Sequence, residues 1–219
     1  MDPVAGIAFF VAGVFAVGDW LSRARRDPSP AWQRVEYVCK PATLSALVIA
    51  AVALDPASGA DARRSWFVAA LVFSLAGDVL LMLPREQFVA GLAAFLVAHL
   101  CYVAGFWTDG PAAIPFLLAA ALVAVAIGSL GLRRIIPGVR RTDRALVAPV
   151  VSYMAVIGLM VATALAVGNP IAAVGAVLFA TSDSMIAWDR FVGEFPGAGV
   201  WIMVTYHLGQ AALVLSLLR

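Results

Sequence analysis

Two aspartates lie within stretches that otherwise resemble lipid-facing helices. Asp78 is in "FSLAGDVLLML" (73–83), and Asp183 is in "LFATSDSMIAW" (178–188). A carboxylate near the middle of a membrane helix costs about 2.5–3.5 kcal/mol on insertion scales, so such residues usually have a function. Two carboxyl groups that meet in a site of low dielectric constant share one proton, and such a pair can act as acid and as base. The two stretches therefore predict proton-transfer chemistry inside a membrane.

Other polar residues have the spacing that brings side chains onto one face of a helix. Residues three or four positions apart are neighbours on a helix surface. The polar pairs with this spacing are Ser74 and Asp78, His99 and Tyr102, Tyr206 and Gln210, and His207 and Gln210. Because lipid cannot satisfy polar groups, these faces must point into the protein. We expect them to converge on one water-containing pocket.

The composition indicates the class of protein. Of the 219 residues, 63% are hydrophobic and 13% are charged, against about 45–50% and about 25% in soluble domains. The mean hydropathy is +0.96, and residues 110–132 and 145–182 contain no Asp, Glu, Lys, Arg or His. The expected fold class is all-α, an integral membrane bundle. The net charge of +2 argues against a nucleic-acid partner, and Cys39 and Cys101 do not have the spacing of a metal site.

Eight membrane-spanning helices are predicted, within a single transmembrane domain of residues 1–219. A helix needs roughly 20 apolar residues to cross the hydrocarbon core, and Pro or Gly separates most of the apolar runs. The predicted helices lie near residues 3–21, 41–55, 65–83, 88–107, 111–132, 145–167, 170–188 and 198–218. The first run lacks a basic leader and a clear cleavage site, so we expect a retained helix. Aligning Asp78 with Asp183 indicates a possible 4+4 parallel repeat.

The positions of Lys and Arg predict how the chain crosses the membrane. Of the 15 such residues, 12 lie in connections that share one side, including residues 22–40 and 133–144, and 3 lie on the opposite side. Positively charged loops remain in the cytoplasm, so both termini are expected to face outward. Asp78, Asp183, His99 and His207 then lie in or near the cytoplasmic half of the membrane, which we expect to be a bacterial inner membrane.

Several motifs occur in an order that resembles a known family. They are Lys40-Pro41, "FSLAGDVLLMLPREQFVAGLAAFLVAHLCY" (73–102), "LFATSDSMIAWDRF" (178–191) and "TYHLGQAAL" (205–213). Together they resemble the YhhN-like, lysoplasmalogenase family of membrane proteins over roughly Lys40 to Leu213. The matching details at the carboxyl end are Ser182-Asp183, Arg190-Phe191, and Tyr206 four residues before Gln210. His207 departs from the pattern, because a second aromatic residue is expected there.

The resemblance implies hydrolysis of the vinyl ether bond of a lyso-ether phospholipid. The products would be a fatty aldehyde and a glycerophospho-head group. Protonation of the alkene carbon gives an oxocarbenium ion, and water then adds to it. In this interpretation Asp78 and Asp183 supply the acid and base, the assignment between them being open, and His99 relays a proton or holds one aspartate. No metal or cofactor is expected, and the expected partners are this substrate and membrane lipids.

The remaining candidate residues are expected to bind the substrate or water. They are Lys40, Ser74, Tyr102, Ser182, Arg190, Tyr206, His207 and Gln210. Lys40, at the predicted start of the second helix, and Arg190 are expected at the cytoplasmic rim. There they could bind the lipid phosphate by charge-assisted hydrogen bonds.

Three alternatives remain open from the residues alone. A proton-coupled transporter would use the two aspartates as proton carriers. A zinc amidase resembling membrane ceramidases would need three or more ligands, and His99 and His207 are the only histidines. A lipid-binding or scaffold protein without activity would tolerate the loss of both aspartates.

Overall fold

Proline and a capping side chain mark where several helices begin. Pro3, Pro30 and Pro170 each lie in the first turn of a helix, where the missing N–H group loses no hydrogen bond. The side chain of Asn169 accepts hydrogen bonds from two backbone N–H groups at the start of its helix. This cap satisfies donors that have no partner within the helix.

The structure is a computed structural model that describes residues 2–25, 29–57, 59–83, 87–108, 110, 118, 121–122, 125–126, 128–129 and 131–218. The regular structure in this part of the chain is helical. The long helices are α1 (Pro3–Ala24), α2 (Pro30–Ala53), α3 (Asp61–Met82), α4 (Phe88–Trp107), α7 (Val147–Ala166), α8 (Pro170–Phe191) and α9 (Ala198–Leu215). The short helices are the π-helical η1 (Gly131–Ile135), α6 (Ile136–Thr142), and the 3₁₀ turns η2 (Arg144–Leu146) and η3 (Ser216–Leu218).

Seven helical segments within the described residues are long and apolar enough to cross a membrane. They confirm the predicted class, an all-α membrane protein. Apart from the start of α2, their ends lie within about one helical turn of the predicted ends. The predicted helix 111–132 lies mostly outside the described residues.

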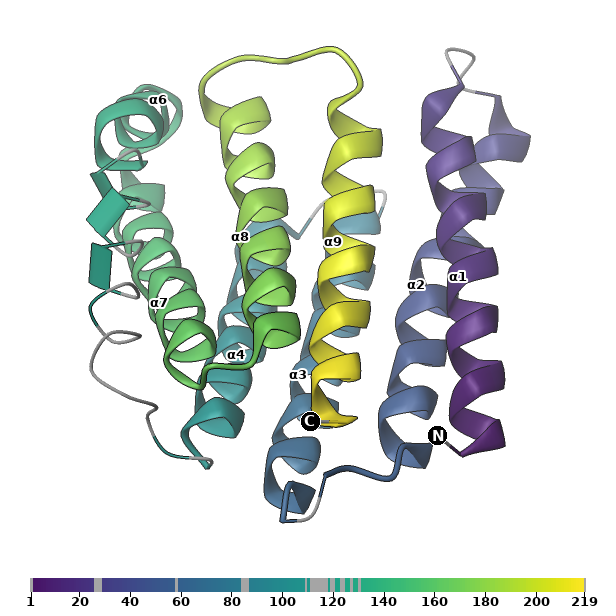
Figure 1. Cartoon of the computed structure of the whole chain (residues 1–219). Helices are drawn as coiled ribbons and strands as arrows, with labels where there is room; N and C mark the ends of the chain where they lie inside the picture. Colours follow the sequence, from purple (N-terminus) through teal and green to yellow (C-terminus); the bar gives the residue numbers. More distant parts are fainter. Residues whose placement is uncertain are drawn as a thin grey trace.

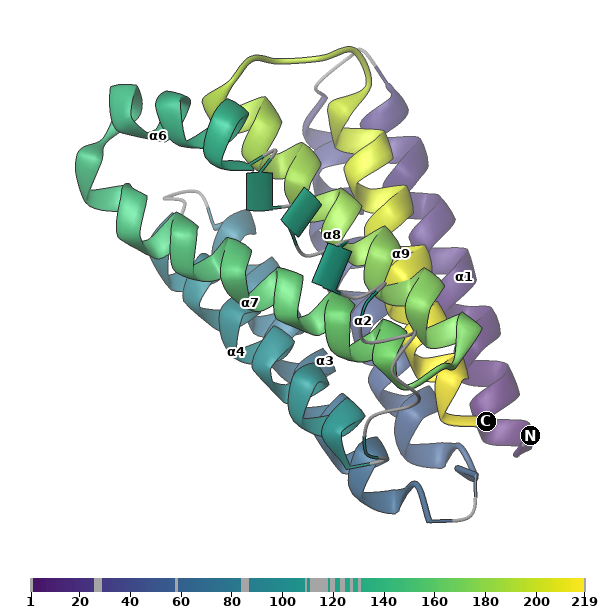
Figure 2. The ribbon, with the colours of Figure 1, turned by 60° about the vertical axis from the view of Figure 1, so that its left-hand side comes forward.

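Consecutive long helices in the pairs α1–α2, α3–α4 and α8–α9 are antiparallel neighbours, whereas α7 runs parallel to α4 (Figure 1). Contacts join α1 to α2, α3 to α4, and α8 to α9, while α9 also contacts α1, α2 and α3. Helix α7 packs against α4 and α8. Both termini lie toward one end of the bundle, and α6 lies across the opposite end, as Figure 2 shows from a second side. The predicted site residues are therefore distributed over five of these helices, α2, α3, α4, α8 and α9.

Two glycines allow α8 and α9 to cross closely. A Cβ atom on Gly175 would lie 2.9 Å from the backbone nitrogen of Leu213, and one on Gly209 would lie 2.9 Å from the backbone nitrogen of Phe179. A side chain at either position would force the helices apart, which is why small residues are common at such crossings. The close approach brings the rings of Phe179 and Tyr206 into edge-to-face contact, with centroids 5.2 Å apart.

Helix α2 corrects one prediction. The apolar run predicted a start near residue 41, but α2 begins at Pro30 and continues through Pro41. A helix that extends beyond the hydrocarbon core can be polar there, so the apolar run gives only part of its length. The hydroxyls of Thr43 and Ser45 donate to backbone carbonyls around the internal proline. Lys40 therefore lies inside the helix and is buried, and it does not begin the helix at the rim.

Candidate active site

Asp183 is held by side chains from two other helices. The hydroxyl of Tyr153, on α7, donates to Oδ2 of Asp183, on α8, at 2.7 Å. The Nε2 atom of His99, on α4, lies 3.5 Å from the same oxygen. The three side chains are at least nine-tenths buried: His99 is 1% exposed, the Asp183 side chain is 8% exposed and Tyr153 is 9% exposed. We call Asp183, Tyr153 and His99 the Asp183 cluster.

The hydrogen bond of His99 shows which of its two ring nitrogens carries the proton when the ring is neutral. Its Nδ1 atom lies 2.6 Å from the backbone carbonyl oxygen of Phe95. A carbonyl oxygen can only accept, so Nδ1 carries a proton and donates it to this bond. In the neutral ring Nε2 is then an acceptor, and it has no hydrogen-bond partner among the described residues. Because Nε2 faces an oxygen that already accepts from Tyr153, the geometry fits a bridging water molecule that donates to both atoms.

Asp78 forms a second, separate group of contacts. The ammonium of Lys40, on α2, lies 3.0 Å from Oδ1 of Asp78, on α3. The hydroxyl of Tyr206, on α9, donates to Oδ2 at 2.9 Å. Both carboxyl oxygens therefore have partners, and one partner is positively charged. We call Asp78, Lys40 and Tyr206 the Asp78 cluster.

A chain of neutral hydrogen bonds lies between α3, α4 and α9. The hydroxyl of Tyr102 donates to Oε1 of Gln210, and Nε2 of Gln210 donates to the hydroxyl oxygen of Ser74. All three residues are fully buried. Buried polar groups are usually satisfied in this way, so the chain fixes three helices relative to one another.

An aromatic cluster lies between these groups. The ring of Phe179 is 4.6 Å from that of His99 and 5.2 Å from that of Tyr206, measured between centroids. Phe95 contacts both Phe179 and Tyr206. The two aspartates do not hydrogen-bond to one another, and each has its own partners. The polar faces thus meet in one buried core, but the carboxyl groups lie in separate clusters and not as the aspartate pair that the sequence predicted.

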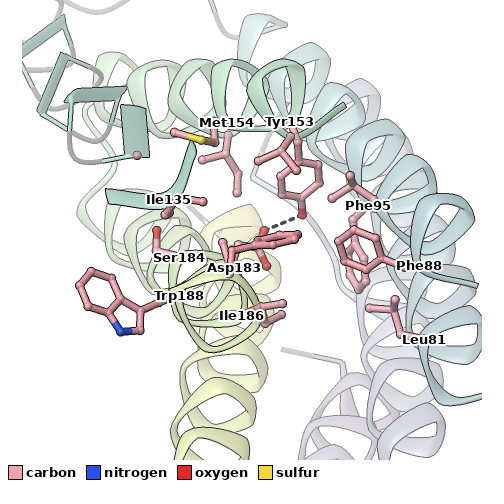
Figure 3. A pocket seen from close by; sticks show the side chains of 16 residues that line it. Leu81, Phe88, Phe95, Ile135, Tyr153, Met154, Asp183, Ser184, Ile186 and Trp188 are labelled. Carbon is pink, nitrogen blue, oxygen red and sulfur yellow. Dashed lines mark hydrogen bonds between the residues drawn. The ribbon is translucent and has the colours of Figure 1, made fainter. Parts of the chain in front are cut away.

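A largely apolar pocket opens beside Asp183 (Figure 3). Its volume is about 130 Å³. Helices α3, α4, α7 and α8 and the η1 segment line it with Leu81, Phe88, Leu92, Phe95, Gly131, Ile135, Val150, Tyr153, Met154, Ile157, Asp183, Ser184, Ile186, Ala187, Trp188 and Phe191. The α8 lining residues run from Asp183 to the end of that helix, so the carboxyl group forms part of the pocket wall. Asp78 is not one of the lining residues.

The other predicted residues lie around this core. The hydroxyl of Ser182 donates to the backbone carbonyl of Ile202 at 2.9 Å and thereby links α8 to α9. The guanidinium of Arg190 lies 3.8 Å from the ring centroid of Phe88, which lines the pocket. Ser182 therefore contacts backbone, whereas Arg190 lies next to the pocket wall.

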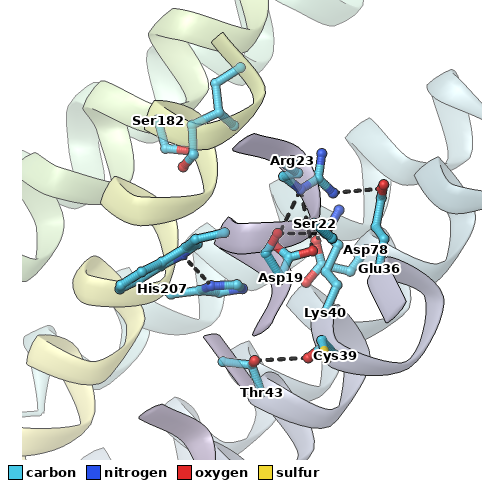
Figure 4. A network of polar contacts seen from close by, with 12 residues as sticks. Asp19, Ser22, Arg23, Glu36, Cys39, Lys40, Thr43, Asp78, Ser182 and His207 are labelled. Carbon is cyan, nitrogen blue, oxygen red and sulfur yellow. Dashed lines mark hydrogen bonds and ion pairs between the residues drawn. The ribbon is translucent and has the colours of Figure 1, made fainter. Parts of the chain in front are cut away.

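His207 belongs to a region between α1 and α9. Its Nδ1 atom accepts a hydrogen bond from the indole N–H of Trp20 at 3.1 Å. Nearby, Arg23 bridges Asp19, at 3.2 Å, and Glu36, at 2.7 Å (Figure 4). This network joins α1 to α2 on the side of the bundle where Lys40 meets Asp78.

Sequence reasoning missed Tyr153. It lies in the long run without charged residues, where no acidic or basic neighbour draws attention to it. Its hydrogen bond joins residues 30 positions apart on different helices, so helical spacing does not reveal it. The available signal was a tyrosine near the start of a predicted span, at a depth similar to that of Asp183.

Comparison with known proteins gives consistent matches. The model of the YhhN family matches residues 35–217. The Mus musculus protein named Lysoplasmalogenase TMEM86B is 35% identical over 87% of this chain and 77% of its own. The Mycobacterium tuberculosis protein named Lysoplasmalogenase is 38% identical over 87% of this chain and 78% of its own.

No solved structure matches the chain significantly. Among the sequence relatives, a more distant one aligns over a greater length. The human protein named Lysoplasmalogenase TMEM86A is 29% identical over 96% of this chain and 87% of its own. The family model covers most of the chain, and relatives above 30% identity align with most of it. This chain therefore belongs to the YhhN family.

Proposed function

We propose that this protein is a lysoplasmalogenase, an enzyme that hydrolyses the vinyl ether bond of a lyso-ether phospholipid. Membership of the YhhN family and the names of the mouse and mycobacterial relatives support this activity. The observation that carries the proposal is the nearly buried carboxyl group of Asp183 in the wall of an apolar pocket within a membrane protein. An alkenyl chain needs apolar surroundings, and its hydrolysis needs a proton donor at the double bond.

Asp183 is the proton donor in this proposal. Its carboxyl proton adds to the second carbon of the alkenyl chain, and the electrons of the double bond form the new C–H bond. The first carbon becomes an oxocarbenium ion, and the resulting carboxylate of Asp183 lies beside it. Water then bonds to the first carbon and gives a proton to Asp183, which restores the acid and leaves a hemiacetal. General acid–base help of this kind is typically worth about 10²–10⁴-fold.

The last step separates the products. The hemiacetal hydroxyl loses its proton, the bond from the first carbon to the glycerol oxygen breaks, and that oxygen gains a proton. Overall one water molecule is consumed, and a fatty aldehyde and a glycerophospho-head group are released. His99, whose Nε2 is an acceptor in the neutral ring, is suited to accept the proton in transit and return it.

Asp78 has a different role from Asp183. Its ion pair with Lys40 and its hydrogen bond from Tyr206 favour the ionised form. A fixed negative charge behind the aromatic cluster stabilises the positive charge that develops on the substrate. Lys40 then serves the site by balancing this buried charge, which revises its expected role as a phosphate ligand.

Binding of the head group is assigned to the mouth of the pocket. Arg190 stacks on Phe88, a pocket residue, and is well suited to a phosphate. Ser74, Tyr102 and Gln210 form a closed hydrogen-bond chain between α3, α4 and α9 and do not line the pocket, so their proposed role is to hold these helices together and not to bind substrate. Ser182 and His207 support the helices that carry these groups. A lyso-lipid has one chain, which suits one apolar pocket.

The chain as a whole is proposed to be a single transmembrane domain with an eighth span within residues 111–132. Asp78 on α3 and Asp183 on α8 would occupy equivalent positions of a 4+4 parallel repeat. The 12-to-3 division of Lys and Arg supports outward termini and a site near the cytoplasmic leaflet of a bacterial inner membrane.

Cysteine labelling tests this orientation. In a background with Cys39→Ala and Cys101→Ala, a membrane-impermeant maleimide added to intact cells should label Ala62→Cys and should not label Thr142→Cys. Both positions are exposed. Gly138 is unsuitable as a probe, because a Cβ there would lie 1.8 Å from a backbone oxygen. Labelling of Thr142→Cys before cell lysis, with Ala62→Cys protected, would reverse the orientation.

The purified protein tests the activity. Incubation with a lysoplasmalogen should release fatty aldehyde, and the matched lysophospholipid with a saturated ether should release none, since it has no alkene to protonate. EDTA should leave the rate unchanged. Loss of activity with EDTA and recovery with zinc would favour the amidase alternative. Proton-driven uptake into vesicles without aldehyde release would favour a transporter, and the absence of both activities would favour a binding protein.

A further inference from the structure

We propose that Tyr153 is a positioning residue that fixes the orientation of the Asp183 carboxyl group, so that its proton reaches only one face of the substrate double bond. This inference rests on the proposed function and concerns a residue outside the predicted site. It predicts a stereochemical property of the reaction that acid catalysis alone does not require.

Tyr153 hydrogen-bonds to one of the two carboxyl oxygens of Asp183. Its hydroxyl donates to Oδ2 of Asp183 at 2.7 Å, and Nε2 of His99 faces the same oxygen. The rings of Tyr153 and His99 pack edge to face, with centroids 5.4 Å apart. Side chains from α4 and α7 therefore both face the Oδ2 atom of Asp183 on α8. Figure 3 shows the Tyr153 hydroxyl directed at Asp183, with both side chains in the pocket lining.

The other oxygen is left for the substrate. Among the described residues, no group hydrogen-bonds to Oδ1 of Asp183, and Oδ1 is also absent from the buried polar atoms that lack a partner. Since the side chain is 8% exposed and lines the pocket, Oδ1 is the oxygen that faces the pocket. The acidic proton therefore belongs on Oδ1, while Oδ2 accepts from Tyr153.

The hydroxyl of Tyr153 matters because the last side-chain torsion angle of an aspartate, χ2, adopts a broad range of values. Rotation about this torsion has shallow preferences, so an unrestrained carboxyl group presents its proton in several directions. The bond to Tyr153 restricts that rotation and also stabilises the carboxylate that forms when the proton leaves. A fixed donor protonates one face of the alkene. In D₂O, the second carbon of the aldehyde then carries one deuterium in a single configuration.

Packing alone offers a simpler explanation of Tyr153, because buried tyrosines usually find a hydrogen-bond partner. Tyr153→Phe separates the two explanations, since it keeps the ring and its contact with His99 and removes only the donor. If Tyr153 positions Asp183, the variant should show a kcat that is lower by about 10–100-fold, the size expected for one hydrogen bond to a charged group. Its KM should change little. A purely structural role would lower the amount of folded enzyme and leave the stereochemistry unchanged.

The experiment uses purified wild-type protein, Tyr153→Phe and the control Tyr37→Phe in D₂O. Tyr37 lies on α2 and is 37% exposed, so its loss should alter neither rate nor configuration. The aldehyde is reduced to the alcohol as it forms, which prevents exchange, and the configuration at the second carbon is determined. We expect one configuration from wild type and Tyr37→Phe, and a mixture from Tyr153→Phe.

The outcomes separate the two proposals. No aldehyde from wild type would overturn the proposed function itself. Aldehyde from wild type, with wild-type kcat and a single configuration from Tyr153→Phe, would overturn only the role of Tyr153. A lower rate with unchanged configuration and a lower melting temperature would also overturn it, in favour of packing.

Discussion

Asp183→Asn is expected to reduce aldehyde release by at least about 10²–10⁴-fold, the usual contribution of a general acid. Asparagine retains the size of the side chain and can still accept the hydrogen bond from Tyr153. It has no acidic proton to add to the alkene carbon. The variant should therefore stay folded and keep the wild-type affinity for substrate, while kcat falls. Aldehyde release, measured with protein of equal melting temperature, checks this result.

The same substitution elsewhere on α8 provides a matched control. Asp189 follows Asp183 by six residues on the same helix and does not line the pocket. Asp189→Asn should therefore retain wild-type activity. If Asp183→Asn turned over substrate at a rate close to that of Asp189→Asn, Asp183 would not be the acid.

Asp78→Asn is expected to lower both activity and stability. Nζ of Lys40 lies 3.0 Å from Oδ1 of Asp78, and both side chains are almost closed to solvent. The substitution therefore leaves the ammonium of Lys40 buried without its counter-ion. Removal of one partner from a buried ion pair typically costs about 3–5 kcal/mol. The melting temperature in detergent should fall, in contrast to Asp183→Asn, and aldehyde release should be lost.

A double variant separates these two effects. Asp78→Asn with Lys40→Met removes both charges and should recover much of the lost melting temperature, since no buried charge is left unpaired. Its activity should remain low, because the negative charge of the site is still missing. Recovery of activity together with stability would mean that Asp78 has only a structural role.

Much of the fold could be predicted from the sequence, because the strongest signals in a membrane protein are local. Apolar runs of sufficient length predict spans, and Pro or Gly between them predicts their ends. Asp78 and Asp183 were conspicuous because the surrounding residues are apolar. The start of α2 was missed for the same reason, since its first turns contain charged residues and do not resemble a span.

The partners of these residues could not be predicted in the same way. Helical spacing relates residues on one helix, whereas the contact between Lys40 and Asp78 depends on how α2 and α3 are rotated about their axes. Spacing paired Ser74 with Asp78, yet Ser74 bonds to Gln210, on another helix. Tyr153 meets Asp183 only because α7 packs against α8. Such contacts follow from packing, which a sequence pattern does not specify.

The most direct test of proton delivery by Asp183 is a comparison of wild type, Asp183→Asn and a protein-free blank in D₂O. The lysoplasmalogen is the substrate, and the released aldehyde is trapped and analysed for deuterium. Wild type should give aldehyde with one deuterium on the second carbon, and Asp183→Asn should give no more aldehyde than the blank. Aldehyde without deuterium at that carbon, or rapid release by Asp183→Asn, would contradict the mechanism.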